Sequence, residues 1–119
     1  MYCMLMNYTP HTIHLQTPLG MAAIRSDGEA RVSEEVSEVI TLGWDEYGDC
    51  GMSQSVPLAV KRYGAVSGLP EPRQHVLYIV STLVQLACPH RSDLVSPDQV
   101  IRDAGGRVIG CKGVYRLQC

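Results

Sequence analysis

Alternating polar and apolar residues predict two strands near the start of the chain. Residues 12–16 follow the two-residue period of a half-buried strand. Residues 17–20, Thr-Pro-Leu-Gly, have the composition of a turn. We therefore expect residues 21–25 to form the return strand of a hairpin, closed by a further turn at residues 26–28.

The middle of the chain has a less regular pattern. Residues 31–36 fit either a strand with its charged side chains outward or the start of a short helix. Residues 43–55 mix Gly, Asp and Ser with Trp44 and Tyr47, which indicates a loop or hairpin tip rather than a linker. Residues 56–63 alternate again, so we expect a strand that ends at Tyr63.

A rigid loop and the most apolar segment follow. Pro70 and Pro72 bracket a glutamate, and each proline fixes its own φ and restricts the preceding residue, so residues 64–72 should form an extended loop. Residues 76–88 predict a buried strand that runs directly into a short helix, which Pro89 ends.

The last third of the chain predicts more strand. Residues 94–95 are typical of a short strand, and residues 99–111 place two apolar runs around a Gly-rich turn, as in a hairpin. The fold class is therefore α+β, an antiparallel β-sheet with one or two short helices. With 119 residues and 45% hydrophobic residues, we expect one small domain over residues 1–119.

Composition excludes several classes of protein. The hydrophobic content is too high and the net charge of −2 too small for a disordered chain. No apolar run is long enough to span a membrane, and the apolar start at residues 1–6 is too short for a signal peptide, so the expected location is the cytosol. Five cysteines without a C-x-x-C pair indicate free thiols.

Charge is distributed unevenly along the chain. Residues 1–60 carry eight acids and two bases, which gives −6, whereas residues 61–119 carry eight bases and four acids, which gives +4. Such asymmetry indicates either an anionic partner for the basic half or halves that complement each other within the fold or an oligomer. The bases are too dispersed to predict a nucleic-acid partner.

No enzyme or metal motif survives inspection. His11 and His14 are three residues apart, so on a strand they point to opposite faces and cannot share a metal. The glycines at 105–106 suit a hairpin turn better than a phosphate loop. Cys88, which precedes His90 closely, ends the most apolar segment, where burial leaves a thiol inert. We expect no catalytic residue, no metal and no cofactor.

A recognition surface remains as the candidate site. It combines bases and an aromatic around the proline-rich loop, and these residues are Lys61, Arg62, Tyr63, Arg73 and Arg91. An aromatic ring stacks on a base, and arginine binds phosphate oxygens with two parallel hydrogen bonds. Glu71 and Asp93 belong to the candidate set because a carboxylate accepts hydrogen bonds from ribose hydroxyls or orients an arginine. Ser92, between Arg91 and Asp93, completes the set. The alternative is that these are ordinary surface residues.

Five segments together resemble a known protein family. They are residues 7–13 (NYTPHTI), 63–72 (YGAVSGLPEP), 77–81 (LYIVS), 91–97 (RSDLVSP) and 101–110 (IRDAGGRVIG). Their order resembles a widespread set of small phage and prophage proteins and is similar to the phage Thoeris anti-defence sponge family, the first type described. The resemblance spans about residues 7–115, except for residues 20–56.

The resemblance implies a function without catalysis. Members of that family bind the cyclic ADP-ribose isomers made by bacterial TIR-domain proteins and sequester them uncleaved, so the downstream effector stays inactive. Some members also hold cyclic di- and trinucleotides in separate pockets of a hexamer assembled from dimers. The implied location is the cytoplasm of the infected bacterial host.

The resemblance also implies roles for individual residues. The base-stacking aromatic of the family falls at Tyr63, before Gly64, which has no side chain to obstruct a flat base. A polar contact residue, usually an amide, falls at Arg73, so this chain departs from the family there. One arginine of the cyclic-oligonucleotide pocket falls at Arg91, whereas the second falls near Val95, which cannot bind phosphate.

Two other functions fit the same residues. One is a phage accessory protein that inhibits a host enzyme by direct contact, and the other is a small enzyme that processes nucleotides. We also expect a homo-oligomer, a dimer or hexamer, that uses the apolar residues 1–6 as an edge strand or interface.

Overall fold

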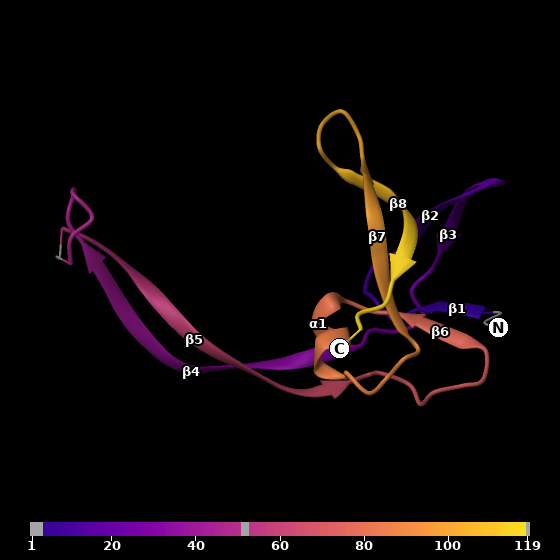
Figure 1. Cartoon of the computed structure of the whole chain (residues 1–119), viewed down its shortest axis with the longest axis horizontal. Helices are drawn as coiled ribbons and strands as arrows, with labels where there is room; N and C mark the ends of the chain where they lie inside the picture. The colour runs from indigo at the N-terminus through magenta and orange to yellow at the C-terminus, as the bar shows by residue number, and fades with distance from the viewer. Residues whose placement is uncertain (1–3, 51–52, 119) are drawn as a thin grey trace. The chain divides into compact units, whose positions relative to one another are not determined.

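The computed structural model describes residues 4–50 and 53–118, which form two units. The first unit comprises residues 1–32 and 65–119, and the second comprises residues 33–64. The α+β class is confirmed, because strands predominate and the described residues contain one short helix, α1 (Thr82–Ala87) (Figure 1). The single domain over residues 1–119 stays a prediction.

A six-stranded sheet forms the first unit. Its strands are, in spatial order, β1 (Met4–Asn7), β6 (Val76–Ile79), β7 (Leu94–Arg102), β8 (Val108–Tyr115), β2 (Ile13–Thr17) and β3 (Gly20–Ile24). Residues 4–6 of the apolar amino end lie in β1, which is an edge strand of this sheet, while residues 1–3 lie outside the described part of the chain. The use of this end in an oligomer stays a prediction.

The sheet is mixed rather than antiparallel throughout. The two hairpins, β2–β3 and β7–β8, are antiparallel as expected, and the second closes with hydrogen bonds between Asp103 and both Gly106 and Arg107. In contrast, β1 pairs with β6, β6 with β7, and β2 with β8 in parallel. Parallel partners require a long connection, so no local turn in the sequence announces them.

The core of the first unit surrounds β6. Tyr78, Ile79 and Val80 are fully buried, and Val84 of α1 and Leu94 of β7 pack into the same region. A strand with parallel partners on both sides is covered on both faces, which explains why residues 76–80 are continuously apolar.

Helix α1 follows β6 directly, as the sequence predicts. The Ser81 hydroxyl accepts a hydrogen bond from the Val84 amide and so caps the first turn. The Cys88 amide donates to the Val84 carbonyl in the last turn, and Pro89 cannot continue the helix because it lacks an amide hydrogen.

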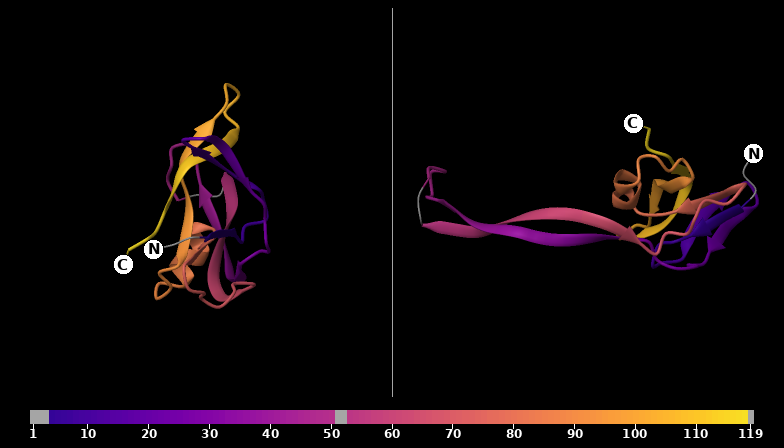
Figure 2. Two further views of the ribbon diagram at one scale, coloured as in Figure 1. Left: turned by 90° about the vertical axis from the view of Figure 1, so that its right-hand side faces the viewer. Right: turned by 90° about the horizontal axis from the view of Figure 1, so that it is seen from below.

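The second unit is a two-stranded ribbon. Its two strands are parts of β4 (Arg31–Trp44) and β5 (Gln54–Ser67). Residues 31–36, for which the sequence left strand and helix open, therefore form a strand. The Ser37 hydroxyl donates to the Val60 carbonyl, and the Ser53 hydroxyl donates to the Trp44 carbonyl, which shows that the strands are antiparallel. The two strands coil about each other along their length (Figure 2).

The expectation that β5 ends at Tyr63 is wrong, because the strand continues through Gly64 to Ser67. A Cβ atom at Gly64 would collide with the Ser33 hydroxyl on the facing strand, so this glycine permits a close approach within the ribbon. The loop begins instead at Gly68, which has a φ of +78° and whose missing Cβ would strike the Glu29 carbonyl oxygen.

Two features of the structure relate to the expected cellular compartment, namely the lengths of its helices and the state of its cysteines. Within the described residues, no helix is both long and apolar enough to cross a membrane. Cys50, Cys88 and Cys111 are free thiols, as expected, and Cys3 and Cys119 lie outside the described residues.

Candidate functional site

A basic cavity of about 480 Å³ lies in the first unit, where the turn after α1 meets the carboxyl-terminal segment. Its lining combines two arginines, a histidine and a serine hydroxyl with apolar and amide side chains. The lining residues are Pro89, His90, Arg91, Ser92, Arg116, Leu117 and Gln118. Small-molecule sites usually have volumes of about 300–1,000 Å³, so this cavity has the size of a nucleotide site.

The turn after α1 places Arg91 at the cavity. Pro89 ends the helix, and the Arg91 amide then donates a hydrogen bond of 3.0 Å to the Cys88 carbonyl. The chain therefore reverses within four residues, and Arg91 and Ser92 line the cavity.

Arg91 forms a bidentate ion pair with Asp93. Its Nε donates to Asp93 Oδ1 and its Nη2 donates to Oδ2, both at 2.8 Å, and Nη2 also donates to the Pro70 carbonyl at 3.0 Å. The side chains are only 15% and 11% exposed, so the pair is largely desolvated. A guanidinium has five N–H donors, so the two donors of Nη1 remain for a ligand.

The ion pair fixes the charge of both groups. The hydrogen bond from Arg91 lowers the pKa of Asp93, against the opposing effect of burial. The same bond raises the pKa of Arg91, and the charge of Glu71 adds to this effect. The charge of Arg116 further lowers the pKa of Asp93. Two guanidinium groups therefore line the cavity, and the carboxylate of Asp93 is paired with one of them.

A buried polar network holds the carboxyl-terminal segment in place. Gln85 of α1 accepts a hydrogen bond of 2.9 Å from the Leu117 amide and donates one of 2.7 Å to the Ser96 hydroxyl. Ser96 in turn donates to the Val80 carbonyl at 2.6 Å. Because Leu117 is fixed to the helix, the preceding residue, Arg116, is held at the cavity wall.

The loop beside the ion pair is braced from the core. The hydroxyl of Tyr78 donates to the Glu71 carbonyl at 3.1 Å, and the Val76 amide donates to the Arg73 carbonyl at 3.3 Å. The loop also contributes the Pro70 carbonyl that accepts from Arg91. The rigidity expected from the two prolines therefore has a second source in these hydrogen bonds.

The structure brings together one part of the predicted site. Arg91 and Ser92 line the cavity, Asp93 pairs with Arg91, and Glu71 contributes to the electrostatics of the same arginine. Arg73 is exposed in the loop that precedes β6.

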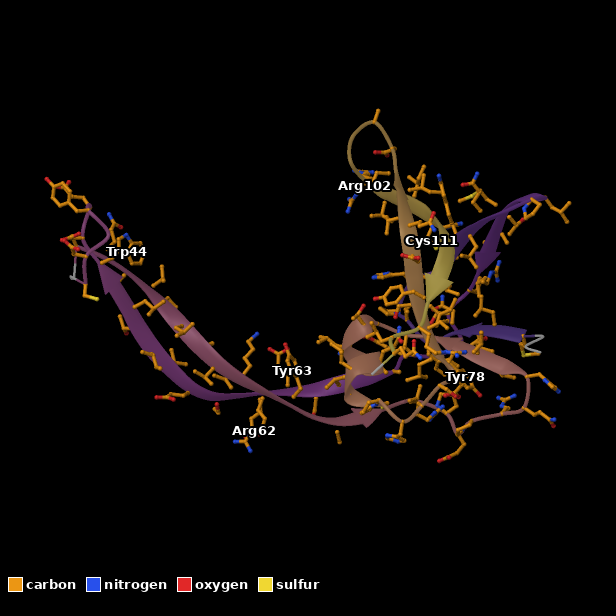
Figure 3. All side chains as sticks on the ribbon, viewed as in Figure 1. Trp44, Arg62, Tyr63, Tyr78, Arg102 and Cys111 are labelled. Atoms are coloured by element: carbon orange, nitrogen blue, oxygen red, sulfur yellow. The ribbon has the colours of Figure 1, made fainter. Side chains whose placement is uncertain are left out.

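Arg62 and Tyr63 belong to the ribbon, in the second unit. They are neighbours on β5 and point to opposite sides of it (Figure 3). The Tyr63 side chain is 51% exposed, as a stacking residue must be. The close approach of Ser33 within the ribbon is enough to explain why residue 64 is a glycine. Gly64 is therefore not evidence of a bound base.

Sequence reasoning missed Arg116. No local pattern marks this residue, since its position depends on the Leu117–Gln85 hydrogen bond between residues 32 positions apart. The resemblance in sequence places the family's second arginine near Val95, which cannot bind phosphate and is buried in β7. Arg116 supplies the second arginine of the cavity.

The site shows no features of a metal centre. Over residues 4–50 and 53–118, the structure contains no cluster of three or more His, Cys, Asp or Glu side chains that could hold a metal ion. Comparison with protein-family models, with curated proteins and with solved structures found no match to the chain.

Proposed function

We propose that the protein binds and sequesters a cyclic ADP-ribose-type signalling nucleotide without cleaving it. It thereby acts as a phage anti-defence sponge that blocks TIR-based immunity in the cytoplasm of the bacterial host. The observation that carries the proposal is the basic cavity with Arg91 and Arg116 on its wall. The identity of the nucleotide rests on the resemblance in sequence.

The chemistry of the cavity suits a pyrophosphate. Arg91 offers its two Nη1 donors, and Arg116 adds a second guanidinium. Asp93 holds Arg91 in one orientation before a ligand arrives, so little side-chain entropy is lost on binding. A sponge requires such preorganised binding of the ground state and no group that stabilises a transition state.

Tyr63 and Arg73 are the residues that the resemblance in sequence assigns to the cyclic ADP-ribose ligand. The exposed ring of Tyr63 is available to stack on the base, and Arg73 is available to take a phosphate oxygen. Both assignments follow from the resemblance in sequence.

The same cavity also fits a second ligand class. The family pocket for cyclic di- and trinucleotides uses two arginines, and Val95 cannot provide the second because it is buried. Arg116, which follows β8 directly, lines the same cavity as Arg91 and supplies the second guanidinium group. We therefore include cyclic oligonucleotides among the candidate ligands.

Calorimetric titration with a panel of cyclic ADP-ribose isomers and cyclic oligonucleotides tests the proposal. Arg116→Gln should weaken binding by about 2–3 kcal/mol through loss of a charge-assisted contact, whereas Arg25→Gln, at an exposed position after β3, should not. Tyr63→Ala should weaken binding by about 1–3 kcal/mol, with Tyr47→Ala at the ribbon tip as its matched control.

The titration also separates the rival functions. If no nucleotide in the panel binds the unaltered protein, the proposal fails and direct inhibition of a host protein becomes the better explanation. If Arg116→Gln and Arg25→Gln bind equally well, the ligand does not occupy the cavity.

A further inference from the structure

The outer face of α1 is apolar. Val84 and Gln85 of this helix are buried, whereas Leu83 and Leu86, which are neighbours one turn apart, are 46% and 61% exposed. A surface helix normally presents charged or polar side chains to water, but α1 contains no charged residue. Two exposed leucines in one short helix therefore mark a candidate interaction surface.

A third leucine lies beside this helix. The Leu117 amide donates a hydrogen bond of 2.9 Å to Gln85 Oε1, and the hydroxyls of Tyr115 and Thr82 share another. These two bonds hold the carboxyl-terminal segment along one flank of α1. Thr82 and Leu86 are four residues apart and so lie on the same stripe of the helix. The Leu117 side chain is 38% exposed. We refer to Leu83, Leu86 and Leu117 as the leucine patch.

The segments that carry the leucine patch are basic. Residues 81–92 and 108–118 contain three bases and no acid, which gives +3. The bases are Arg91, Lys112 and Arg116. Leu117 lines the basic cavity together with two of these arginines, so the patch and the cavity adjoin. Asp93, which pairs with Arg91, reduces the charge of the surface only to +2.

We propose that the leucine patch is a docking surface for another protein, and that the docked element is an amphipathic helix with acidic residues beside its apolar stripe. Aliphatic side chains of that helix pack on the three leucines. A carboxylate one turn farther along its axis, at roughly 5 Å, faces the arginines of the cavity. Charge complementarity favours this partner over a neutral or basic one.

The form of the surface favours a helix over an extended peptide. An extended peptide adds to a sheet edge through its backbone hydrogen bonds, and a helix such as α1 offers no sheet edge. Leu83 and Leu86 instead form a ridge of the kind that fits between the side-chain rows of a second helix. A partner helix of about 12 residues is roughly 18 Å long, which is enough to cover α1, roughly 9 Å long, and to extend past its end.

An anionic membrane is also apolar and negatively charged, but it fits this surface less well. Binding to a membrane surface increases with the apolar area that enters it, and many membrane-bound helices have about 20–30 residues. Helix α1 has six residues and exposes two leucines, which is a small area for that purpose. The inference does not rest on nucleotide binding, since it needs only the leucine patch and the charge beside it.

Fluorescence anisotropy with labelled synthetic peptides tests the proposal on the full chain. The probe is a helical peptide of about 16 residues, with leucines spaced three and four residues apart and glutamates beside that stripe. One control peptide has lysine in place of every glutamate, and a second has the same composition in scrambled order. We expect the probe to bind with a micromolar dissociation constant and both controls to bind at least about 10-fold more weakly. Absence of binding by the probe, or equal binding by either control, would overturn the proposal.

A double variant locates the docking surface. Leu83→Gln/Leu86→Gln replaces two exposed leucines by a polar residue with good helix propensity, so the melting temperature should not change. The dissociation constant of the acidic probe should rise at least about 10-fold, because two apolar contacts are lost. Leu19→Gln, at a fully exposed position between β2 and β3, is the matched control and should leave it unchanged. If the double variant binds the probe as well as the wild type does, the patch is not the docking surface.

The same double variant separates this proposal from the alternatives. It keeps every arginine of the cavity, so a nucleotide that binds the wild-type protein should bind it equally well. Vesicles of phosphatidylglycerol and sedimentation velocity test the other two occupants. Binding to the vesicles that the double variant abolishes would assign the patch to a membrane. An oligomer that the double variant dissociates would assign it to a second copy of the chain. Either result would overturn the proposal.

Discussion

Substitution of Asp93 by asparagine should destabilise the protein through the arginine that remains behind. Asparagine has nearly the same shape as aspartate, so the variant leaves the packing in place and removes the charge. Arg91 then keeps its bond to the Pro70 carbonyl but loses its counter-ion and at least one of the two 2.8 Å bonds. Because the Arg91 side chain is only 15% exposed, water cannot fully replace what is lost.

The expected loss is about 3 kcal/mol at pH 7. Removal of one partner from a fully buried ion pair costs about 3–5 kcal/mol, and a charge-assisted hydrogen bond contributes about 1.5–3 kcal/mol. The pair here is mostly but not completely buried, so the lower part of the first range applies. With a urea m-value of about 1.5 kcal/mol/M, the midpoint of unfolding should fall by about 2 M.

The difference between the two proteins should depend on pH in one direction. The pKa of Asp93 in the folded protein lies below its ordinary value, because Arg91 donates hydrogen bonds to the carboxylate. The contribution to stability is therefore complete above the unfolded pKa, which is about 4. It is lost as the pH falls through the folded pKa, where the carboxylate becomes protonated. Asparagine does not titrate, so the wild-type protein should lose its advantage in acid.

Urea unfolding at pH 7 and at several values below pH 4 measures this effect directly. Asp27→Asn, at an exposed position, is the control, and its free energy of unfolding should stay within about 0.5 kcal/mol of the wild-type value. The ion pair would not stabilise the folded protein if Asp93→Asn were as stable as the wild type at pH 7, or if the difference in stability persisted unchanged in acid.

Three further substitutions or reagents test the fold. Gly68→Ala should destabilise the protein by at least about 2 kcal/mol in thermal unfolding, since its φ is +78° and the new Cβ would strike the Glu29 carbonyl oxygen; an unchanged melting temperature would contradict this. Gln85→Leu removes the bonds that fix the carboxyl-terminal segment and should lose about 2–3 kcal/mol; amide exchange at Leu117 should accelerate, and equal protection in both proteins would refute the role of Gln85. Iodoacetamide should alkylate the exposed Cys50 much faster than Cys111, because burial shields the Cys111 thiol and raises its pKa; equal rates in the folded protein would count against the buried position.

The sequence predicts those parts of the fold that depend on neighbouring residues. The turn between residues 17 and 20, the helix that ends before Pro89 and the hairpin around Gly106 all have local signals, and all are confirmed. The parallel pairing of β6 has no such signal, because β6 pairs with β1 and β7, and both of these strands are distant from it in sequence.

The ribbon was hard to predict for a different reason. Val39 and Ile40 are adjacent and both exposed, so the two faces of β4 are similarly apolar and the alternation is weak. A strand that is covered on one face only would alternate clearly. The two faces of β4 are therefore both partly apolar, and the structure leaves both of them exposed.

One half of the candidate site, Arg91 with Asp93, could be predicted from the sequence, whereas Arg116 could not. The sequence indicated Arg91 as a base at the end of the predicted helix and Asp93 as a carboxylate that could orient an arginine, and the structure joins the two in an ion pair. Arg116 could not be found in this way, since the network through Gln85 and Ser96 that places it forms only in the folded chain.

Recovery of the bound ligand tests the central proposal most directly. The protein is incubated with a cyclic ADP-ribose isomer, separated from unbound nucleotide by gel filtration, denatured by heat and analysed by mass spectrometry over several hours of incubation. We expect the wild-type protein to retain the ligand and to release it with its mass unchanged at every time, and we expect Arg116→Gln to retain much less. Failure of the wild-type protein to retain any isomer in the panel, or release of ADP-ribose that accumulates with time, would contradict it.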